Sequence, residues 1–171
     1  DKSFSGVKVL TSASLEMEPG EVMAVVGQNG AGKSTLIKIL TGAYSRDAGS
    51  ITFQGREAEF RSTADSQAAG IATIYQEINL APNRSVAENI FIGHEPVRGG
   101  VDIDTGAQAQ ATAALMRRLE QDIAPDTPLD HLRVGQQQIV EIAKALSQDA
   151  RILILDEPTS ALSAAEVDVL F

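Results

Sequence analysis

Residues 27–34, near the N-terminus, have the residue types and the spacing of a phosphate-binding loop. They read GQNGAGKS, which matches the pattern G-x-x-x-x-G-K-S. Glycine lets backbone N–H groups surround an anion because it has no Cβ in the way. The ammonium group of Lys33 would neutralise the outer phosphates and the hydroxyl of Ser34 would bind Mg²⁺, so the loop predicts a bound nucleoside triphosphate with its metal. The predicted nucleotide contacts in and beside the loop are Gly27, Asn29, Gly30, Ala31, Gly32, Lys33, Ser34 and Thr35.

Two acidic residues, Asp156 and Glu157, could complete a site for phosphoryl transfer. They follow the run RILIL at residues 151–155, which is typical of a buried strand. Open α/β sheets bind ligands at the carboxyl ends of their strands, where Asp156 could share Mg²⁺ with Ser34. Glu157, one residue further on, would orient and deprotonate the attacking water. Together with Lys33, these acids predict hydrolysis of the bound nucleotide.

The elements that would position the phosphate loop lie directly on either side of it. The apolar run VMAVV, residues 22–26, predicts a strand buried on both faces of a parallel sheet. Behind the loop, Leu36, Ile37 and Leu40 recur at helical spacing. The loop would therefore join a strand to the N-terminus of a helix, whose dipole favours a phosphate.

The whole chain predicts an α/β fold: a P-loop NTPase core with a mostly parallel sheet, an N-terminal antiparallel β part and an inserted α-helical subdomain. Alternation of Ala13, Leu15 and Met17 with polar neighbours predicts half-exposed antiparallel strands. We expect the core and β part at 1–81, the helical subdomain at 82–147, and a final strand, loop and helix at 148–171. Further strands are predicted at 51–53 and 71–75, and helices at 86–92, 105–119 and 136–146.

Composition narrows the range of partners. The chain of 171 residues has 14 Lys and Arg against 23 Asp and Glu, a net charge of −9, and contains no basic run, which argues against nucleic acid as the main partner. It has no cysteine, which excludes a disulfide scaffold. No apolar run approaches the roughly 18–20 residues of a membrane-spanning helix. We therefore expect any contact with a membrane to go through another protein.

Further motifs follow the phosphate loop in a fixed order. They are Tyr75-Gln76-Glu77, VGQQQ at 134–138, ILILDEP at 152–158 and SALS at 160–163. This order resembles that of ABC-transporter ATPases over essentially the whole chain. More narrowly, QEINLAPNRSVAENIFIG and VGQQQIVEIAKALS resemble the first ATP-binding cassette of bacterial monosaccharide importers of the ribose and xylose kind.

The resemblance implies roles for further residues. Phe4 would stack on the adenine of ATP, although it could instead be a core aromatic of the first strand. Gln76 would sense the γ-phosphate, bind the metal and couple to the membrane subunit. Gly135, with Gln136, would contact ATP bound to a partner cassette through a helix N-terminus. The segment 160–163 would cross the interface between the two cassettes.

The chain departs from the family pattern in its signature motif, which usually reads LSGGQ. Arg133 replaces the serine and Val134 replaces the first glycine. Arg133 would either lend charge to the phosphate or point to solvent, and both alternatives stay open here. In addition, the family carries a switch histidine beyond the point where this sequence stops. For a chain of this length we therefore expect measurable affinity for Mg-ATP with negligible hydrolysis.

The resemblance implies the ATPase subunit of a monosaccharide importer. Two cassettes would close head to tail on two ATP molecules and drive paired transmembrane permease subunits, with sugar delivered by a periplasmic binding protein. The subunit would be peripheral, on the cytoplasmic face of the bacterial inner membrane. Two alternatives remain: a non-transport ABC-type ATPase acting in repair or translation, and a nucleotide-binding module without turnover of its own.

Overall fold

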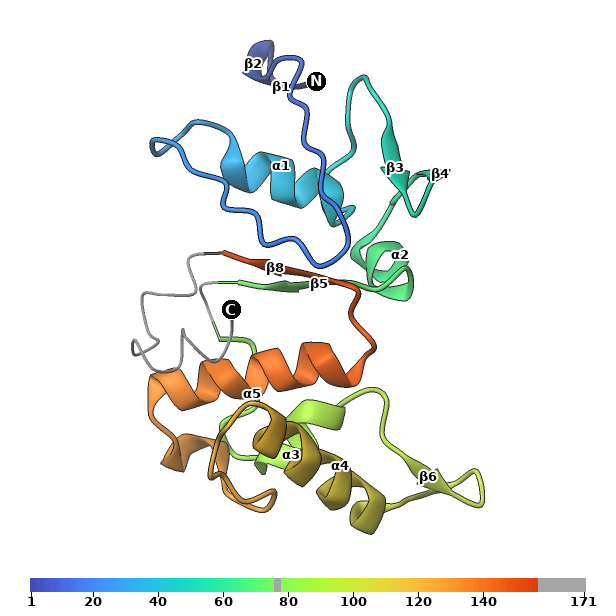
Figure 1. Cartoon of the computed structure of the whole chain (residues 1–171), viewed down its shortest axis with the longest axis vertical. Coiled ribbons are helices and arrows are strands. Elements are labelled where there is room, and N and C mark those ends of the chain that lie inside the picture. Colours follow the sequence, from blue (N-terminus) through green and yellow to red (C-terminus); the bar gives the residue numbers. More distant parts are fainter. Residues whose placement is uncertain (76–77, 157–171) are drawn as a thin grey trace. The chain divides into compact units, whose positions relative to one another are not determined.

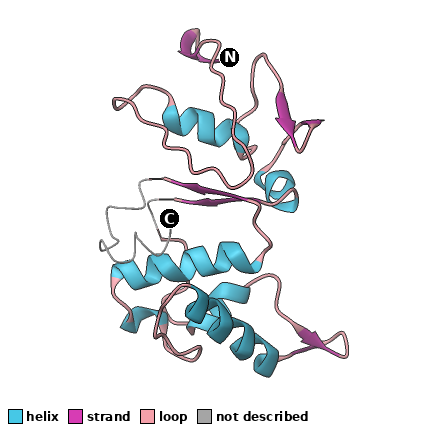
Figure 2. Ribbon diagram, in the orientation of Figure 1, coloured by secondary structure: helices cyan, strands magenta, loops and turns pink. Residues whose placement is uncertain are grey.

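The computed structural model of the chain describes residues 1–75 and 78–156 (Figure 1). Gln76, Glu157 and the segment 160–163, to which the sequence assigns roles, lie outside the described residues. The chain divides into two compact units, Asp1–Ala72 and Thr73–Phe171, and each is described by itself. Helices and strands occur in both units (Figure 2).

The first unit begins with a β-hairpin that carries Phe4. Strands β1 (Lys2–Phe4) and β2 (Val7–Leu10) pair antiparallel, with Phe4 opposite Val7. The two residues of the turn, Ser5 and Gly6, have φ of 49° and 83°. A turn with positive φ at both central positions matches the natural twist of the two strands, which explains this tight local hairpin.

Helix α1 (Lys33–Leu40) follows the phosphate loop, and a second hairpin, β3 (Ile51–Phe53) with β4 (Arg56–Ala58), comes after it. Helix α2 (Thr63–Ala68) closes the unit and begins with a capping box. The buried hydroxyl of Ser66 in α2 donates to the backbone oxygen of Thr41, 2.8 Å away. This bond fastens α2 to the end of the helix that carries the phosphate loop.

The second unit has a helical core of α3 (Val86–Phe91), α4 (Thr105–Arg118) and α5 (Val134–Ser147), which pack against one another. These are the helices that periodicity predicts at 86–92, 105–119 and 136–146. A short 3₁₀ turn, η1 (Leu129–His131), precedes α5, and a small hairpin of β6 (Val97–Arg98) and β7 (Asp102–Ile103) lies between α3 and α4. The fully buried side chains shared by these elements include Val86, Ile90, Met116, Leu129, Ile139 and Ile142.

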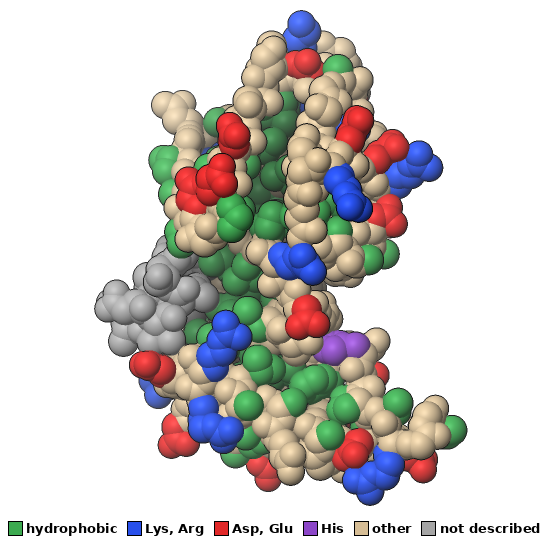
Figure 3. Space-filling model, turned by 45° about the vertical axis from the view of Figure 1, so that its right-hand side comes forward, with side chains coloured by type: hydrophobic (Ala, Val, Ile, Leu, Met, Phe, Trp, Pro, Cys, Tyr) green, Lys and Arg blue, Asp and Glu red, His purple; other side chains and the backbone are tan. Residues whose placement is uncertain are grey.

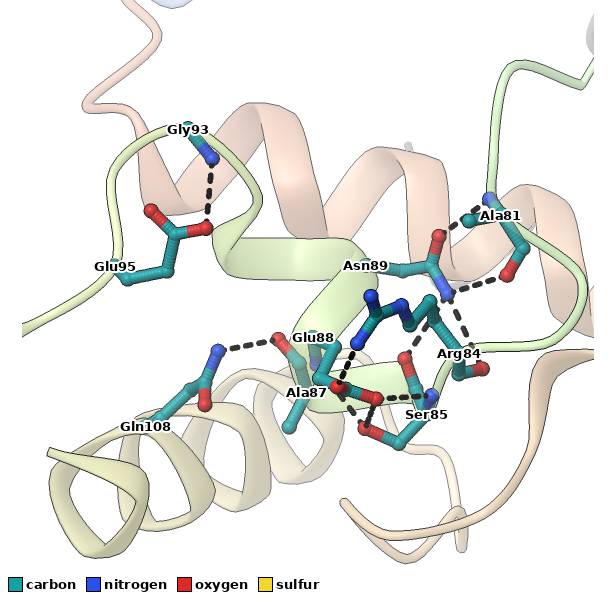
Figure 4. A network of polar contacts seen from close by, with 9 residues as sticks. All are labelled: Ala81, Arg84, Ser85, Ala87, Glu88, Asn89, Gly93, Glu95 and Gln108. Carbon is teal, nitrogen blue, oxygen red and sulfur yellow. Dashed lines mark hydrogen bonds and ion pairs between the residues drawn. The ribbon is translucent and has the colours of Figure 1, made fainter. Parts of the chain in front are cut away.

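A buried asparagine, Asn89 on α3, holds the segment that leads into the helical core (Figure 4). Its Oδ1 accepts the N–H of Ala81 at 2.7 Å, while its Nδ2 donates to the carbonyls of Ala81 and Ser85, each at 3.0 Å. Only 1% of Asn89 is exposed. Ser85 also caps α3, because its hydroxyl accepts the N–H of Glu88 and the Glu88 carboxylate accepts the N–H of Ser85.

Strand β5 (Ile71–Ile74) pairs with β8 (Ile152–Leu155), and these strands agree with the predictions at 71–75 and 151–155. The ladder continues past β8, since the N–H of Asp156 donates to the carbonyl of Ile74 at 3.0 Å. Three other strand pairs, β1–β2, β3–β4 and β6–β7, are antiparallel hairpins closed by short turns. Two of these hairpins, β1–β2 and β3–β4, lie in the N-terminal part of the chain, for which the sequence predicts an antiparallel β part.

The predicted strand at 22–26 is wrong. These residues form an extended loop without strand pairing, and Val22 and Val26 are 67% and 90% exposed. The predicted strands around Ala13, Leu15 and Met17 are absent for the same reason. A strand needs a neighbour that satisfies its backbone groups. Strand β2 already pairs with β1 across its tight turn, and within the described part of the chain no strand pairs with residues 22–26.

Acidic and basic side chains are interspersed over the face shown in Figure 3, in keeping with a mixed charged surface of net charge −9. Within the described residues, none of the helices has the length and apolar character needed to span a membrane.

Candidate nucleotide-binding site

The phosphate loop has the backbone conformation that its glycines permit. Gly30 and Gly32 have φ of 83° and 94°, a region that residues with a Cβ rarely adopt. The N–H of Ala31 donates to the carbonyl of Gln28 at 3.1 Å, which closes the turn before Gly32. Gly32 is also the N-cap residue of α1, so the loop leads directly into the helix, as the sequence predicts.

Glycine is required at position 32 because strand β2 approaches the backbone closely there, as well as for its backbone conformation. A Cβ at this position would lie 2.8 Å from Cδ2 of Leu10 and 3.0 Å from the carbonyl oxygen of Val9. Strand β2 therefore packs directly against the phosphate loop. In contrast, a Cβ on Gly30 would meet nothing within 4 Å.

The side chain of Lys33 folds back across the loop. Its Nζ donates to the carbonyl oxygens of Gly27 at 2.6 Å and Gln28 at 3.1 Å. The ammonium group is thus already held at the loop, and a phosphate oxygen would offer it a charged acceptor in place of a carbonyl.

The first turn of α1 suits an anion. It contains no acidic residue, and Gly32 has no side chain that could occupy the free N–H groups. Ser34, in this turn, is exposed, and Thr35 is half-buried. Unpaired N–H groups and the positive end of the helix dipole attract a phosphate here, so these residues fit the predicted nucleotide.

Phe4 lies at the surface of the first unit and is 39% exposed, so it is not a buried core aromatic. Its ring contacts Tyr44, with centroids 5.3 Å apart and planes at 68°. The ammonium group of Lys2 lies over the Phe4 ring, 5.2 Å from the centroid. The contact with Tyr44 joins residues forty positions apart in the chain, and no local sequence pattern predicts it.

The signature residues begin α5, in the second unit. Gly135 and Gln136 are the second and third residues of this helix, and Arg133 is its exposed N-cap residue. The N–H of Arg133 donates to Oε1 of Gln136 at 3.2 Å. The side chain of Gln136 therefore helps to cap the helix in this structure.

Asp156 directly follows β8 and is half-buried. It and the signature residues belong to the second unit, whereas Phe4 and the phosphate loop belong to the first. Among residues 1–75 and 78–156, no group of three or more His, Asp or Glu side chains is arranged to hold a metal ion. By residue type alone, the Ser34 hydroxyl and the Asp156 carboxylate are each oxygen ligands that Mg²⁺ accepts.

Solved structures of known proteins share this fold. An ATP-binding cassette of an ABC transporter matches with a TM-score of 0.81 and 24% identity, over 99% of this chain and 70% of that one. The protein cbiO1 from Clostridium perfringens, part of the ABC transporter complex cbiONQ, matches with a TM-score of 0.74 and 26% identity, over 91% of this chain and 61% of that one. These likenesses confirm the predicted P-loop NTPase fold of the α/β class.

Comparison with sequence relatives identifies the protein family. The family model for the ABC transporter matches residues 10–160, and the chain belongs to this family. The ribose import ATP-binding protein RbsA 2 of Streptomyces avermitilis is 55% identical over 170 residues, which are 99% of this chain and 34% of that protein. The arabinose import ATP-binding protein AraG of Shigella sonnei is 48% identical over 170 residues, with the same coverage of 99% and 34%. The chain thus spans about a third of the length of these relatives, and the predicted resemblance is confirmed.

Proposed function

We propose that the chain is the ATP-binding and ATP-hydrolysing part of a bacterial monosaccharide importer. The observation that carries this proposal is the phosphate loop, in which Gly32 has a left-handed φ of 94° and Lys33 Nζ lies 2.6 Å from the loop carbonyl of Gly27. Identity of 55% to a ribose import ATP-binding protein supports a monosaccharide as the transported substrate.

The proposed mechanism is positioning and electrostatic stabilisation by the residues of this chain. Lys33 would neutralise the outer phosphates, and Ser34, Asp156 and Gln76 are the residues that would hold Mg²⁺. When bound, Mg²⁺ supplies further neutralisation of phosphate charge. Glu157 orients the attacking water and accepts its proton.

The partners proposed from the family and its import relatives are a second ATP-binding cassette, transmembrane permease subunits and, indirectly, a periplasmic sugar-binding protein. Gly135 and Gln136 would meet the nucleotide of the second cassette, since a helix N-terminus favours a phosphate. The protein would then lie peripherally on the cytoplasmic face of the inner membrane.

The test is sugar uptake by vesicles that contain the complete transporter, with ribose and arabinose as substrates and ATP inside. The Glu157→Gln variant should keep Mg-ATP affinity but lose most phosphate release and uptake, with the two cassettes trapped in the closed dimer. Glu57→Gln, at an exposed position on β4, is the matched control and should behave as the unchanged protein.

Three other outcomes would change the proposal. Unchanged turnover in Glu157→Gln would remove the assigned role of that residue. ATP hydrolysis without uptake of any sugar would favour a non-transport ATPase. Binding of Mg-ATP without phosphate release in the complete transporter would favour a nucleotide-binding module, an alternative suggested by Arg133 and Val134 in the signature motif.

A further inference from the structure

Strand β1, which carries Phe4, is fastened to the segment after α1 by Asp47. The Asp47 carboxylate accepts Lys2 Nζ at 2.8 Å through one oxygen and the N–H of Ser3 at 2.6 Å through the other. The N–H of Asp47 in turn donates to the carbonyl of Asp1 at 3.1 Å. The hydrogen bond from Lys2 lowers the pKa of Asp47, so the carboxylate stays charged. All three residues before Phe4 are therefore held in place.

The ring of Phe4 is restrained yet accessible. The Lys2 ammonium over it belongs to a side chain that is only 11% exposed, so this cation has little freedom to leave the ring face. The ring of Tyr44 meets Phe4 in an edge-to-face arrangement at 5.3 Å. With both contacts made, 39% of Phe4 still faces solvent. The Phe4 side chain is thus held by two neighbours and can still be reached from solvent.

The same elements lead to the phosphate loop. The N–H of Tyr44 donates to the carbonyl of Lys38 in α1 at 2.9 Å, and α1 begins at the loop. On the other side, β2 of the hairpin contacts the loop at Gly32 through Val9 and Leu10. The position of the Phe4 ring is thus tied to the phosphate loop through both α1 and the hairpin.

We propose that Tyr44 and the Lys2–Asp47 ion pair are positioning residues of the nucleotide site, which hold the Phe4 ring for stacking on the purine base. This inference rests on the proposed ATP-binding function and on the family resemblance, which implies that Phe4 stacks on the adenine of ATP. The positioning residues act through Phe4, and they contribute to binding of the base but not of the phosphates.

The test compares two ligands, Mg-ATP and Mg-tripolyphosphate, which lacks the base, by titration calorimetry. Tyr44→Leu and Lys2→Met should each weaken Mg-ATP binding about three- to tenfold, because each removes one restraint on the ring. Both should leave tripolyphosphate affinity unchanged. Tyr44→Phe should restore normal Mg-ATP affinity. Lys8→Met removes the same charge from an exposed site on β2 and should alter neither affinity.

A Phe4→Leu variant separates failure of this inference from failure of the proposed role of Phe4. If Phe4→Leu leaves both affinities unchanged, the base does not stack on Phe4 and the underlying role is wrong. If Phe4→Leu weakens only Mg-ATP while Tyr44→Leu and Lys2→Met do not, the positioning inference is overturned and Phe4 keeps its role. Equal loss for both ligands in Tyr44→Leu would mean general structural damage and would also overturn the inference.

Discussion

Among single residues, position 32 requires glycine for two reasons, its backbone conformation and the close approach of strand β2. Its φ of 94° excludes a side chain on conformational grounds, and the contact with Leu10 and Val9 excludes one on steric grounds. Gly30 has a similar φ of 83° but open space around it. A comparison of substitutions at the two positions therefore distinguishes the cost of backbone strain from the cost of a steric clash.

We expect Gly32→Ala to lower the free energy of unfolding by about 2–5 kcal/mol, from about 1–2 kcal/mol of left-handed strain and about 1–3 kcal/mol of overpacking. Gly30→Ala should lose only the strain, about 1–2 kcal/mol. Urea unfolding of the two variants beside the unchanged protein makes the comparison. Equal losses would show that the contact between β2 and the loop is not as close as described.

A half-buried carboxylate on α5, Glu141, should make stability depend on pH. Its Oε1 accepts the N–H of Asn79 at 2.7 Å, while its Oε2 is buried without a hydrogen-bond partner among the described residues. Burial raises the pKa of Glu141 above its ordinary value of 4.5, although Asn79 and the charge of Lys144 partly oppose this rise. The folded state therefore holds the proton more tightly than the unfolded state, so this stabilisation is full below pH 4.5 and is lost as pH rises through the folded pKa.

The Glu141→Gln variant keeps an acceptor for Asn79 and removes the buried charge. It should be more stable than the unchanged protein at pH 7, and the difference should shrink as pH falls toward 4. Urea unfolding across this pH range measures it, with the exposed Glu120→Gln as control. A variant that is less stable at pH 7 would mean that the ionised carboxylate is favourably solvated or paired.

At the scale of elements, Asn89 connects helix α3 to the segment that enters the helical core. Because the side chain is 1% exposed and bonds Ala81 and Ser85, its removal leaves backbone groups without partners. Asn89→Ala should lower the free energy of unfolding by about 2–4 kcal/mol. Asn83→Ala, in the same segment but exposed, should change stability by no more than about 0.5 kcal/mol. Similar values for both variants, measured by urea unfolding, would contradict the role of the network.

Elements were predictable where the information is local. The helices at 86–91, 105–118 and 134–147 follow from apolar spacing and capping residues within each segment. The prediction of a strand at 22–26 was wrong because a strand forms only beside a neighbouring strand. The apolar composition of the run does not show whether such a neighbour exists. The phosphate loop was predictable because eight adjacent residues carry its whole conformation. The contacts of Phe4 with Tyr44 were not, since they join distant segments.

At the scale of the whole molecule, the proposed chemistry draws on both units. The phosphate loop, Ser34 and Phe4 lie in the first unit, and Asp156 and the signature residues lie in the second. The family match over residues 10–160 spans both units as well. A ligand that binds only the folded state stabilises it by about 2.7 kcal/mol at one hundred times its Kd.

We therefore expect saturating Mg-ATP to raise the thermal unfolding midpoint, and Mg-tripolyphosphate to raise it less, because it lacks the base. Scanning calorimetry with and without each ligand measures the shift, and the Lys33→Met variant provides the baseline. An equal shift for both ligands would show that the base contributes nothing to binding.

Residues 27–34 are proposed to bind the phosphates of Mg-ATP. Titration calorimetry of the unchanged protein and of Lys33→Met tests this proposal most directly, with Lys8→Met as a charge-matched control. We expect one Mg-ATP per chain, and a loss of affinity of about 10- to 100-fold in Lys33→Met from the missing charge-assisted hydrogen bonds. Lys8→Met should bind normally. Equal affinity of Lys33→Met and the unchanged protein would mean that Lys33 does not hold the phosphates.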